Sequence, residues 1–264
     1  MQFVKKLKIS AAASLLALAT LCPPLAAQDS TTESSAFDGH LSLGLAFIAA
    51  PEFEGSDKTD FHVVPVIEYH SDRFFISGES GLGVKFQQEA LTFVPALKFR
   101  FGRDEDDSKL LKGMGDVDWG LEAGAFAEYQ LDDQLKAKLE IMQGLGDAEG
   151  LTAALGLSHM ITLDQSTSLM LGVGTMYADS HYNKQYFGVT RKQSRNSGYE
   201  QYSPGGGFKH VDATAAVSRE LTEQFSLSLF GQYKRLTGPA ADSPIVKRGS
   251  KNQLASGVSL TWTP

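Results

Sequence analysis

Histidine is the residue type in this 264-residue chain best suited to act as a base or a metal ligand. Six histidines are present, at His40, His62, His70, His159, His181 and His210. None of them falls in the HExxH spacing that places two zinc ligands on one helix face. Ser158 directly precedes His159, but adjacent strand residues point to opposite faces, and the GxSxG elbow of serine hydrolases is absent. The sequence therefore predicts no catalytic residue, no metal site and no cofactor, and a hydrolase is the least favoured function.

Two charged clusters lie in stretches without a regular hydrophobic pattern. The acidic run Asp104 to Asp107 offers the oxygen ligands that Ca²⁺ and Mg²⁺ prefer, but it lacks the glycine and spacing of a calcium loop. We interpret it as a solvated charge run, with cation binding as the alternative. The other cluster is basic and consists of Lys184, Arg191, Lys192 and Arg195. Because Lys and Arg pair with phosphate, this loop could bind an anionic group, and a loop that folds inward over the protein is the open alternative.

Composition restricts the classes of protein. The formal net charge is −7, and the three lysines of the N-terminus make the remainder more negative still, which argues against nucleic-acid binding. Cys22 is the only cysteine. It follows Leu21, whereas a lipidated cysteine follows a small residue, so we do not expect a lipid anchor. A disulfide framework is excluded as well.

The N-terminus has the pattern of an export signal. Lys5, Lys6 and Lys8 precede an apolar run over 9–21, and small residues follow it. We predict cleavage between Ala27 and Gln28, with an apolar core helix as the alternative. The run is shorter than the roughly 20 apolar residues that a permanent membrane helix needs. No later stretch reaches 18 apolar residues, so no transmembrane helix is expected there.

From about residue 40 onward, apolar and polar residues alternate with the period of a β-strand. Several runs are longer than the five or six residues of an average soluble strand and match the roughly 9–11 residues of a membrane strand. Short turns alternate with long connections over 102–116, 178–206 and 236–250, as in outer-membrane barrels. Backbone groups in lipid find no water, so such a sheet must close. The pattern predicts an antiparallel transmembrane β-barrel; a lipocalin-like barrel or a sandwich is the soluble alternative.

The pattern yields an odd number of strands, whereas outer-membrane barrels normally have an even number. The eleven expected strands lie near 40–48, 61–70, 73–86, 91–101, 117–130, 134–143, 150–161, 166–177, 207–219, 224–236 and 251–262. We predict 12 strands, within a range of about 10–14, the missing one lying at 183–190 or hidden within 73–86. Counted from the C-terminus, the 49–60 connection is periplasmic; counted from the N-terminus, it is extracellular. The expected organisation is a signal peptide (1–27), a periplasmic segment (28–39) and the barrel (40–264).

Three sets of turn residues resemble the MipA/OmpV family of outer-membrane proteins over about 38–262. They are Pro51, Phe53, Gly55, Ser56 and Asp57; Tyr186, Phe187, Gly188, Val189, Tyr202 and Gly206; and Asp242, Ser243 and Pro244. Prolines, glycines and short polar residues of this kind also build turns, so each set is either structural or an interaction site. The chain departs from the family at its end, where Thr263 and Pro264 follow Trp262 instead of a terminal aromatic residue.

The resemblance implies an outer-membrane location and a scaffolding role, since the family's named member interacts with a lytic transglycosylase and a murein synthase. It implies no catalytic residues. The expected partners are outer-membrane lipid and lipopolysaccharide, and murein-synthesis or murein-hydrolysis proteins; the oligomeric state stays open. A small solute pore is the alternative. Its lumen would be lined by charges of both signs, which could instead pair and plug it: Lys98, Arg100, Glu122, Glu128, Lys136, Lys138, Glu140 and Lys234.

Overall fold

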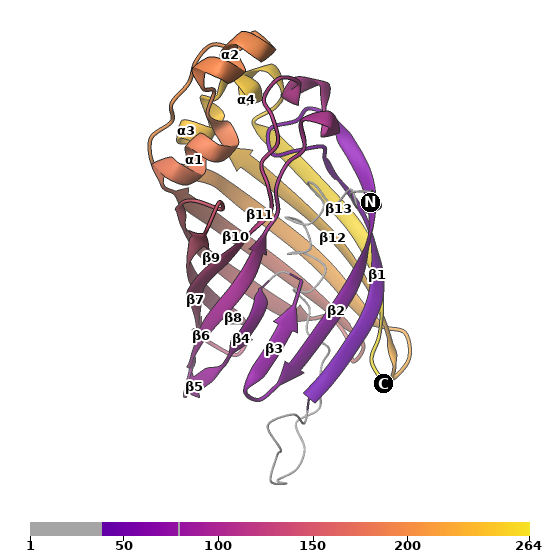
Figure 1. Ribbon diagram of the computed structural model, residues 1–264. Helices are drawn as coiled ribbons and strands as arrows, with labels where there is room; N and C mark the ends of the chain where they lie inside the picture. Colours follow the sequence, from indigo (N-terminus) through magenta and orange to yellow (C-terminus); the bar gives the residue numbers. More distant parts are fainter. Residues whose placement is uncertain (1–38, 79) are drawn as a thin grey trace, which may run out of the picture.

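The computed structural model describes residues 39–264 apart from 79, and they form one closed antiparallel β-barrel (Figure 1). The strands are β1 (Gly39–Pro51), β2 (Thr59–Ser71), β3 (Phe74–Ser77), β4 (Gly81–Val84), β5 (Phe86–Gln88), β6 (Leu91–Arg100), β7 (Gly120–Gln130), β8 (Leu135–Leu145), β9 (Leu151–Thr162), β10 (Thr167–Ala178), β11 (Gly207–Glu220), β12 (Phe225–Leu236) and β13 (Asn252–Trp262). Segments β4 and β5 both pair with β6 and are separated only by Lys85, so they are two parts of one strand. The described barrel therefore has 12 strands, as the sequence predicted.

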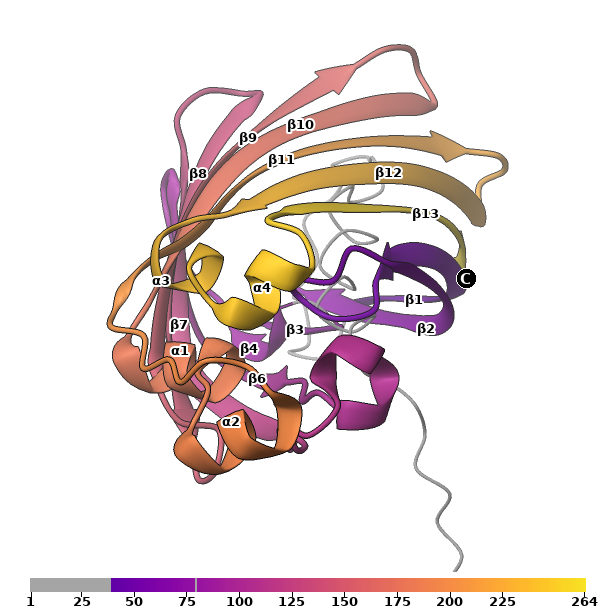
Figure 2. The ribbon, with the colours of Figure 1, turned by 90° about the horizontal axis from the view of Figure 1, so that it is seen from above.

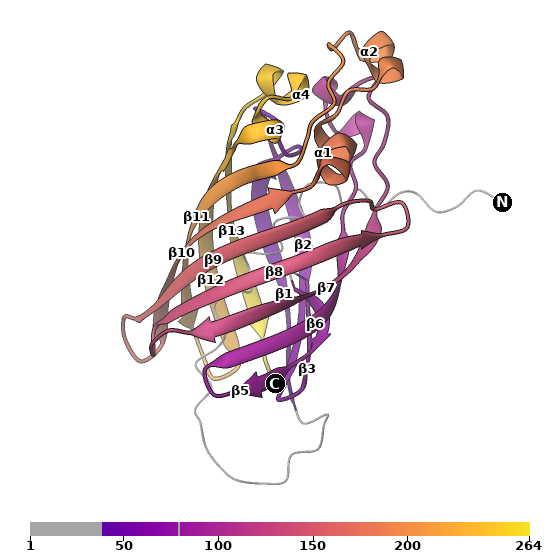
Figure 3. The same ribbon diagram turned by 90° about the vertical axis from the view of Figure 1, so that its left-hand side faces the viewer.

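The alternation places a row of apolar side chains on the outside of the barrel. In β1, Leu45 and Phe47 are 51% and 57% exposed, whereas their neighbours Ala46 and Ile48 are fully buried inside. The same pattern recurs around the wall, whose strands are strongly tilted (Figure 3). A continuous apolar exterior of this kind is stable only in contact with lipid. None of the helices within 39–264, residue 79 aside, has the length and apolar character to cross a membrane.

The missing strand lies in the 73–86 segment, which contains two strands instead of one. The chain turns between β3 and β4, and Gly81 there has a φ of +76°. A Cβ at this position would collide with the Leu97 carbonyl oxygen of the adjacent strand, so only glycine fits. The other candidate was wrong, because 183–190 falls largely in helix α1 (Ser180–Phe187), whose first turn Asp179 caps by accepting from the Tyr182 amide at 2.9 Å.

This count settles the side on which the 49–60 connection lies. Strand β1 begins at the end of the barrel that carries the short turns and ends beside the long loops (Figure 1). Since short turns are periplasmic and long loops extracellular, residues 52–58 lie on the outer side. Of the two counts, the one from the N-terminus, which places 49–60 on the extracellular side, agrees with this arrangement. The predicted signal peptide, its cleavage site and nearly all of the 28–39 segment lie outside the described residues.

Three periplasmic turns share one construction. At Leu131, Leu163 and Leu221 the chain leaves a strand, and the next residue is Asp132, Asp164 or Thr222, respectively. In each turn the side-chain oxygen of that residue accepts from backbone amides two or three residues later, at 2.8–3.3 Å. These backbone amides donating to the carboxylates keep the pKa values of Asp132 and Asp164 below their ordinary value. Short side-chain-capped turns leave the periplasmic end with little projecting surface.

The outer loops pack together as a lid over the barrel mouth (Figure 2). The lid contains α1, α2 (Arg191–Ser197), α3 (Gly238–Ala241), α4 (Pro244–Arg248), and two short 3₁₀ helices, η2 (Glu105–Asp107) and η3 (Lys109–Leu111). One apolar cluster joins α1 to the β12–β13 loop through Phe187 and Val246, and another joins Phe53 to Leu111 and Ile245. The lid therefore unites four loops that are distant in sequence.

The barrel wall is incomplete on one side. Strand β2 pairs with β1 along its whole length, but with β3 only at Tyr69 and His70. No described strand pairs with the other edge of its outer half. The two strands that flank this place, β2 and β6, each contain an internal proline, Pro65 and Pro95. Proline lacks an amide donor and is confined to sheet edges and irregularities, so both residues suit an interrupted wall.

We expect the two ends of the barrel to be labelled differently in cells. With Cys22 replaced by Ser, single cysteines at Asp57→Cys in the β1–β2 loop and Asp133→Cys in a short turn would each be the only thiol. Both positions are exposed. A membrane-impermeant maleimide should label the first variant in intact cells, and the second only after the outer membrane is permeabilised. If only the Asp133→Cys variant is labelled in intact cells, the short turns face outward and the proposed orientation is wrong.

Candidate functional site

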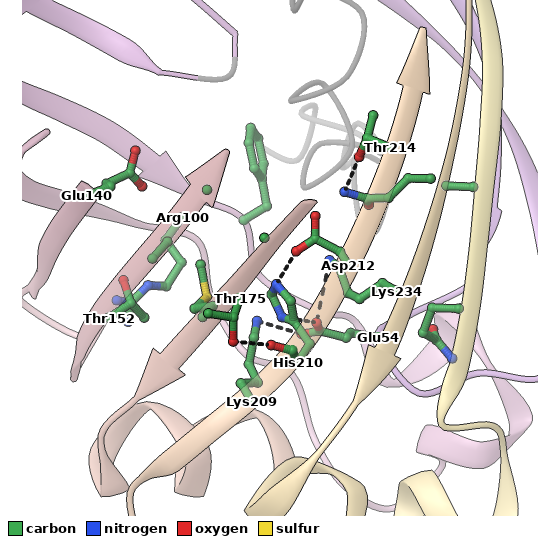
Figure 4. A pocket seen from close by; sticks show the side chains of 18 of the residues that line it. Glu54, Arg100, Glu140, Thr152, Thr175, Lys209, His210, Asp212, Thr214 and Lys234 are labelled. Carbon is green, nitrogen blue, oxygen red and sulfur yellow. Dashed lines mark hydrogen bonds and ion pairs between the residues drawn. The ribbon is translucent and has the colours of Figure 1, made fainter. Parts of the chain in front are cut away.

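A cavity of about 450 Å³ lies inside the barrel beneath the lid (Figure 4). Its wall comes from strands β6 to β13, and its roof from the β1–β2 loop, the 101–119 loop and helix α1. Volumes in this range accommodate small molecules. Both aromatic and charged or titratable side chains line it, and the latter are Glu52, Glu54, Lys98, Arg100, Arg103, Asp107, Glu122, Lys138, Glu140, Lys209, His210, Asp212 and Lys234.

Glu54 forms the centre of an ion-pair cluster that connects the lid to the wall. Its carboxylate lies 3.0 Å from Lys209 Nζ, 3.7 Å from Lys234 Nζ and 3.9 Å from His210 Nδ1. His210 Nε2 lies 3.4 Å from Asp212 Oδ2, which continues the cluster along β11. Glu54 comes from an outer loop, whereas its partners come from β11 and β12. The cluster therefore couples the position of the β1–β2 loop to the barrel.

A β-bulge explains why two consecutive residues of β11 face the lumen. The pairing with β10 shifts between Met176 and Tyr177, which oppose His210 and Phe208, so Lys209 is the additional residue. Lys209 and His210 are both buried, at 4% and 6% exposure. A bulge redirects a side chain that strict alternation would send to the opposite face. The period-two pattern alone placed Lys209 on the lipid side, so sequence reasoning missed it.

Burial opposes ionisation of Glu54, but the charges of Lys209, Lys234 and His210 outweigh it and lower the pKa of Glu54 to about 2. Lys209 Nζ also donates to the Tyr182 hydroxyl at 3.1 Å and lies 4.9 Å from the centre of the Tyr182 ring. Tyr182 stacks on Tyr186 with ring centres 4.7 Å apart. Burial raises the pKa of both phenols, so both stay neutral hydrogen-bond donors.

Arg100 is fully engaged in the wall. Its Nε lies 2.6 Å from Glu122, and Nη1 and Nη2 donate to the Ala148 and Gly150 carbonyls at 3.1 Å each. The guanidinium thereby holds the β8–β9 loop against β6. All of its nitrogens have acceptors, so Arg100 is a structural residue that also lines the cavity.

The other inward charges that the sequence singled out are also paired. Lys98 and Lys138 lie 2.8 Å and 3.6 Å from Glu140. Lys136 lies 3.3 Å from Glu128, and Lys234 belongs to the Glu54 cluster. The inward charges of both signs are therefore paired, within one strand or between strands, and do not form a row of free charges along the lumen.

The interior is not uniformly polar, contrary to the polar inner face that the sequence pattern indicated. Ile48, Val66, Met170 and Phe230 belong to an apolar cluster on the inner face of β1, β2 and β10–β13. A second cluster contains Phe75, Val94 and Phe126. A barrel of this size is narrow enough for side chains from opposite walls to fill part of the lumen. Apolar packing therefore fills two regions of the inner face, beside the charged cavity.

The family-motif residues meet within the lid. Gly55 has a φ of +113°, and its amide donates to Gln253 Oε1 at 3.0 Å. The Ser243 hydroxyl is fully buried and donates to the Phe187 carbonyl at 2.8 Å. Pro244 occupies the first turn of α4, where a missing amide hydrogen is harmless. These residues join the β1–β2, β10–β11 and β12–β13 loops.

The remaining motif residues have the same setting. Val189 and Tyr202 pair through both backbone amides, and the Tyr202 hydroxyl donates to the Pro239 carbonyl at 2.8 Å. Gly206 lies against the Tyr177 hydroxyl, where a Cβ would be 2.6 Å away. Pro51 ends β1, Ser56 accepts from the Lys58 amide at 3.0 Å, Asp57 is exposed, Gly188 ends α1 and Asp242 ends α3. A docking role for any of them stays a prediction.

Neither of the two charged loop clusters belongs to the cavity as a group. Lys184 on α1 and Arg191, Lys192 and Arg195 on α2 are all exposed on the outside of the lid. Contact of these four with anionic groups of the cell surface stays a prediction. In the acidic run, Glu105 accepts from the Gly113 and Gly115 amides, and Asp107 accepts from the Asp104 amide. These carboxylates stabilise their own loop.

The closed sheet, its apolar exterior and the asymmetry of its two ends define an outer-membrane β-barrel. The model of one family, "MltA-interacting protein MipA", matches residues 43–264. The chain therefore belongs to the MipA family.

Similar curated proteins include the MltA-interacting protein of Escherichia coli K12, which is 25% identical over 85% of this chain and 91% of that protein. The outer membrane protein OmpV of Vibrio cholerae is 26% identical over 60% of each chain. Among solved structures, an outer-membrane channel from Pseudomonas putida F1 is similar, with 10% identity, a TM-score of 0.46, and coverage of 90% of this chain and all of that one. The NanC porin has 6% identity and a TM-score of 0.45, over 84% and 98%.

We expect Glu54→Gln to destabilise the protein by about 3–5 kcal/mol, because two buried ammonium groups lose their anion. The pKa of Glu54 is about 2 in the folded protein and 4.5 ordinarily, so its ionisation stabilises the fold fully above pH 4.5. This contribution disappears as the pH falls from 4.5 to 2. Guanidinium unfolding of detergent-refolded protein should therefore show a stability difference between wild type and variant that shrinks over this interval. Glu200→Gln, on the exposed lid surface, should leave the unfolding midpoint unchanged; a constant difference from pH 6 to 2 would contradict the assignment.

Proposed function

We propose that the protein is a narrow outer-membrane channel for a small solute, which enters beneath the lid from the outer side. The observation that carries this proposal is the cavity inside the barrel, lined by aromatic and charged side chains and roofed by the packed loops. Ion pairs across strands hold most lining charges in place, so the narrow lumen discriminates between solutes instead of passing ions freely. Passage requires the lid to move.

Phe187 is the position at which the lid can be loosened most directly. It is 1% exposed, packs among residues of α1 and the β12–β13 loop, and its carbonyl accepts from Ser243. Burying an aspartate there in place of Phe187 opposes packing of the lid because an unpaired carboxylate is costly to desolvate. Phe187 itself lies in the lid and not in a strand of the barrel wall.

We expect the refolded wild type to show small and infrequent conductance events in planar bilayers, and Phe187→Asp to show them several-fold more often. Lys184→Ala changes an exposed residue of the same helix and should behave like wild type. Heat modifiability on SDS gels checks that each barrel is folded. No conductance event from either the wild type or Phe187→Asp would dismiss the channel.

We propose as a second function the docking of murein-synthesis or murein-hydrolysis proteins. It is supported by the name of a relative, "MltA-interacting protein", and by a set of exposed acidic residues in the periplasmic turns. These residues are Asp72, Glu89, Asp132, Asp133, Asp164 and Glu223. The short turns offer little surface, so a partner would bind largely through charge, and a basic partner fits.

We expect Asp133→Lys combined with Glu223→Lys to reduce the recovery of murein enzymes that co-purify with the wild type in low-salt membrane extracts. The acidic residues of the periplasmic turns attract a basic partner, whereas the two introduced lysines repel it. Asp57→Lys combined with Glu200→Lys makes the same change of charge on the outer side and should not alter recovery. If the wild type retains no murein enzyme, the docking function fails.

A further inference from the structure

Arg103 lies at the outer end of the cavity in the connection that follows β6. Its backbone is held firmly, since its amide donates to the Val117 carbonyl at 2.8 Å and its carbonyl accepts from the Val117 amide at 2.7 Å. The residue is only 7% exposed and lines the cavity. A rigid loop therefore presents a buried cation to the space beneath the lid.

The guanidinium of Arg103 is only partly satisfied. Nη1 donates to the Tyr186 carbonyl at 2.8 Å, but Nε and Nη2 are buried and have no hydrogen-bond partner. Burial lowers the pKa of Arg103 to about 10, which leaves the group charged at neutral pH. Leaving donors of a charged group buried and unpaired costs more free energy than a typical hydrogen bond returns. Arg100, by contrast, has acceptors for all of its nitrogens.

Nε and Nη2 form the edge of a guanidinium that binds two oxygens of one oxyanion side by side. The nearest acidic candidate within the protein is Asp107, which also lines the cavity. No ion pair within 4 Å joins it to Arg103 among the residues described here, and its carboxylate accepts from the Asp104 amide at 3.0 Å. Nε and Nη2 thus have no partner within the described residues, and because both are covered by neighbouring atoms, a molecule in the cavity would reach this edge only when the lid moves.

Aromatic side chains line the cavity together with Arg103. The Tyr186 hydroxyl donates to the Phe101 carbonyl at 3.0 Å, and Tyr186 stacks on Tyr182. Phe101, Tyr182, Tyr186 and Phe187 all line the same cavity as Arg103. Such walls favour a ligand with an apolar body, because burying apolar surface against aromatic rings is more favourable than leaving both in water.

We propose that Arg103 binds, through Nε and Nη2, the two oxygens of a small organic anion whose apolar body lies against Phe101, Tyr182 and Tyr186. The inference rests on the proposed channel function and narrows its solute to an anion with an apolar part. Arg103 is the residue that selects the charged group, and the aromatic wall selects the body. Arg100 and Lys209 are held by internal partners and maintain the wall of the site.

Binding is tested by isothermal titration of the detergent-refolded barrel with benzoate, inorganic phosphate and the neutral benzamide. We expect the wild type to bind benzoate, and to bind phosphate and benzamide at least tenfold more weakly. Arg103→Gln should weaken benzoate binding roughly 10- to 100-fold, because a bidentate charged interaction is lost. Arg103→Lys keeps the positive charge but cannot donate two parallel hydrogen bonds to one carboxylate, so it should also weaken benzoate binding. Arg195→Gln, an exposed arginine of the lid, and Asp107→Asn should bind benzoate as well as the wild type or better.

Heat modifiability and far-UV circular dichroism show that each variant is folded before titration. Failure of the wild type to bind benzoate, or equal binding by Arg103→Gln, overturns the inference. If phosphate binds tightly and depends on Arg103 while benzoate does not bind, the inference that the ligand has an apolar body is refuted. These results do not depend on bilayer conductance: a barrel that conducts but binds no benzoate refutes only the site, and one that binds benzoate but never conducts refutes only the channel.

Discussion

The hydrogen bonding of backbone groups in lipid is the constraint on which this structure depends. An amide or carbonyl that faces hydrocarbon has no water to bond, so each strand must pair on both edges or be protected in another way. The sheet meets this requirement by closing through the pairing of β4 with β6. Among the residues described, strand pairing lapses beside the outer half of β2, and the strands that flank this place contain Pro65 and Pro95. The need to pair backbone groups therefore explains why the sheet closes. The gap lies beside strands with prolines, which have no amide hydrogen to donate.

Closure in turn creates the interior. A ring of this size leaves a narrow lumen, and charged groups placed there are removed from bulk water. They are stable only in pairs, which explains the ion pairs of Arg100 with Glu122 and of Lys98 with Glu140. The same requirement draws Glu54 of an outer loop down to Lys209 and Lys234. The lid is therefore held by apolar packing from above and by charge from within.

Membership in the MipA family establishes the class of protein and its location in the outer membrane. It does not choose between a channel and a docking protein. The geometry separates the two physically: the motif residues and the cavity lie on the outer side, whereas a murein enzyme would have to meet the periplasmic turns. The two functions use opposite ends of the barrel and are compatible in one molecule.

Most of the barrel could be predicted from the amino-acid sequence. A long period-two pattern requires one face in lipid, and turn residues such as Leu131-Asp132 mark strand ends, because both signals are local. The split of 73–86 into two strands was visible only as glycines, since the decisive contact, between Gly81 and the Leu97 carbonyl, joins different strands. The helix that covers most of 183–190 was not predicted, because tertiary packing and not intrinsic helix propensity stabilises such a short helix.

The sequence by itself determined that the chain forms a closed barrel with an apolar exterior and that charges of both signs face inward, because alternation and strand length act residue by residue. Only the tertiary structure decided which charges pair, how the loops join into a lid and why Lys209 faces the lumen. The physical reason is that these features depend on register, on one bulge and on contacts between distant loops. The free edge of Arg103 belongs to the same group, because an unmade hydrogen bond can be recognised only when every neighbour is in place.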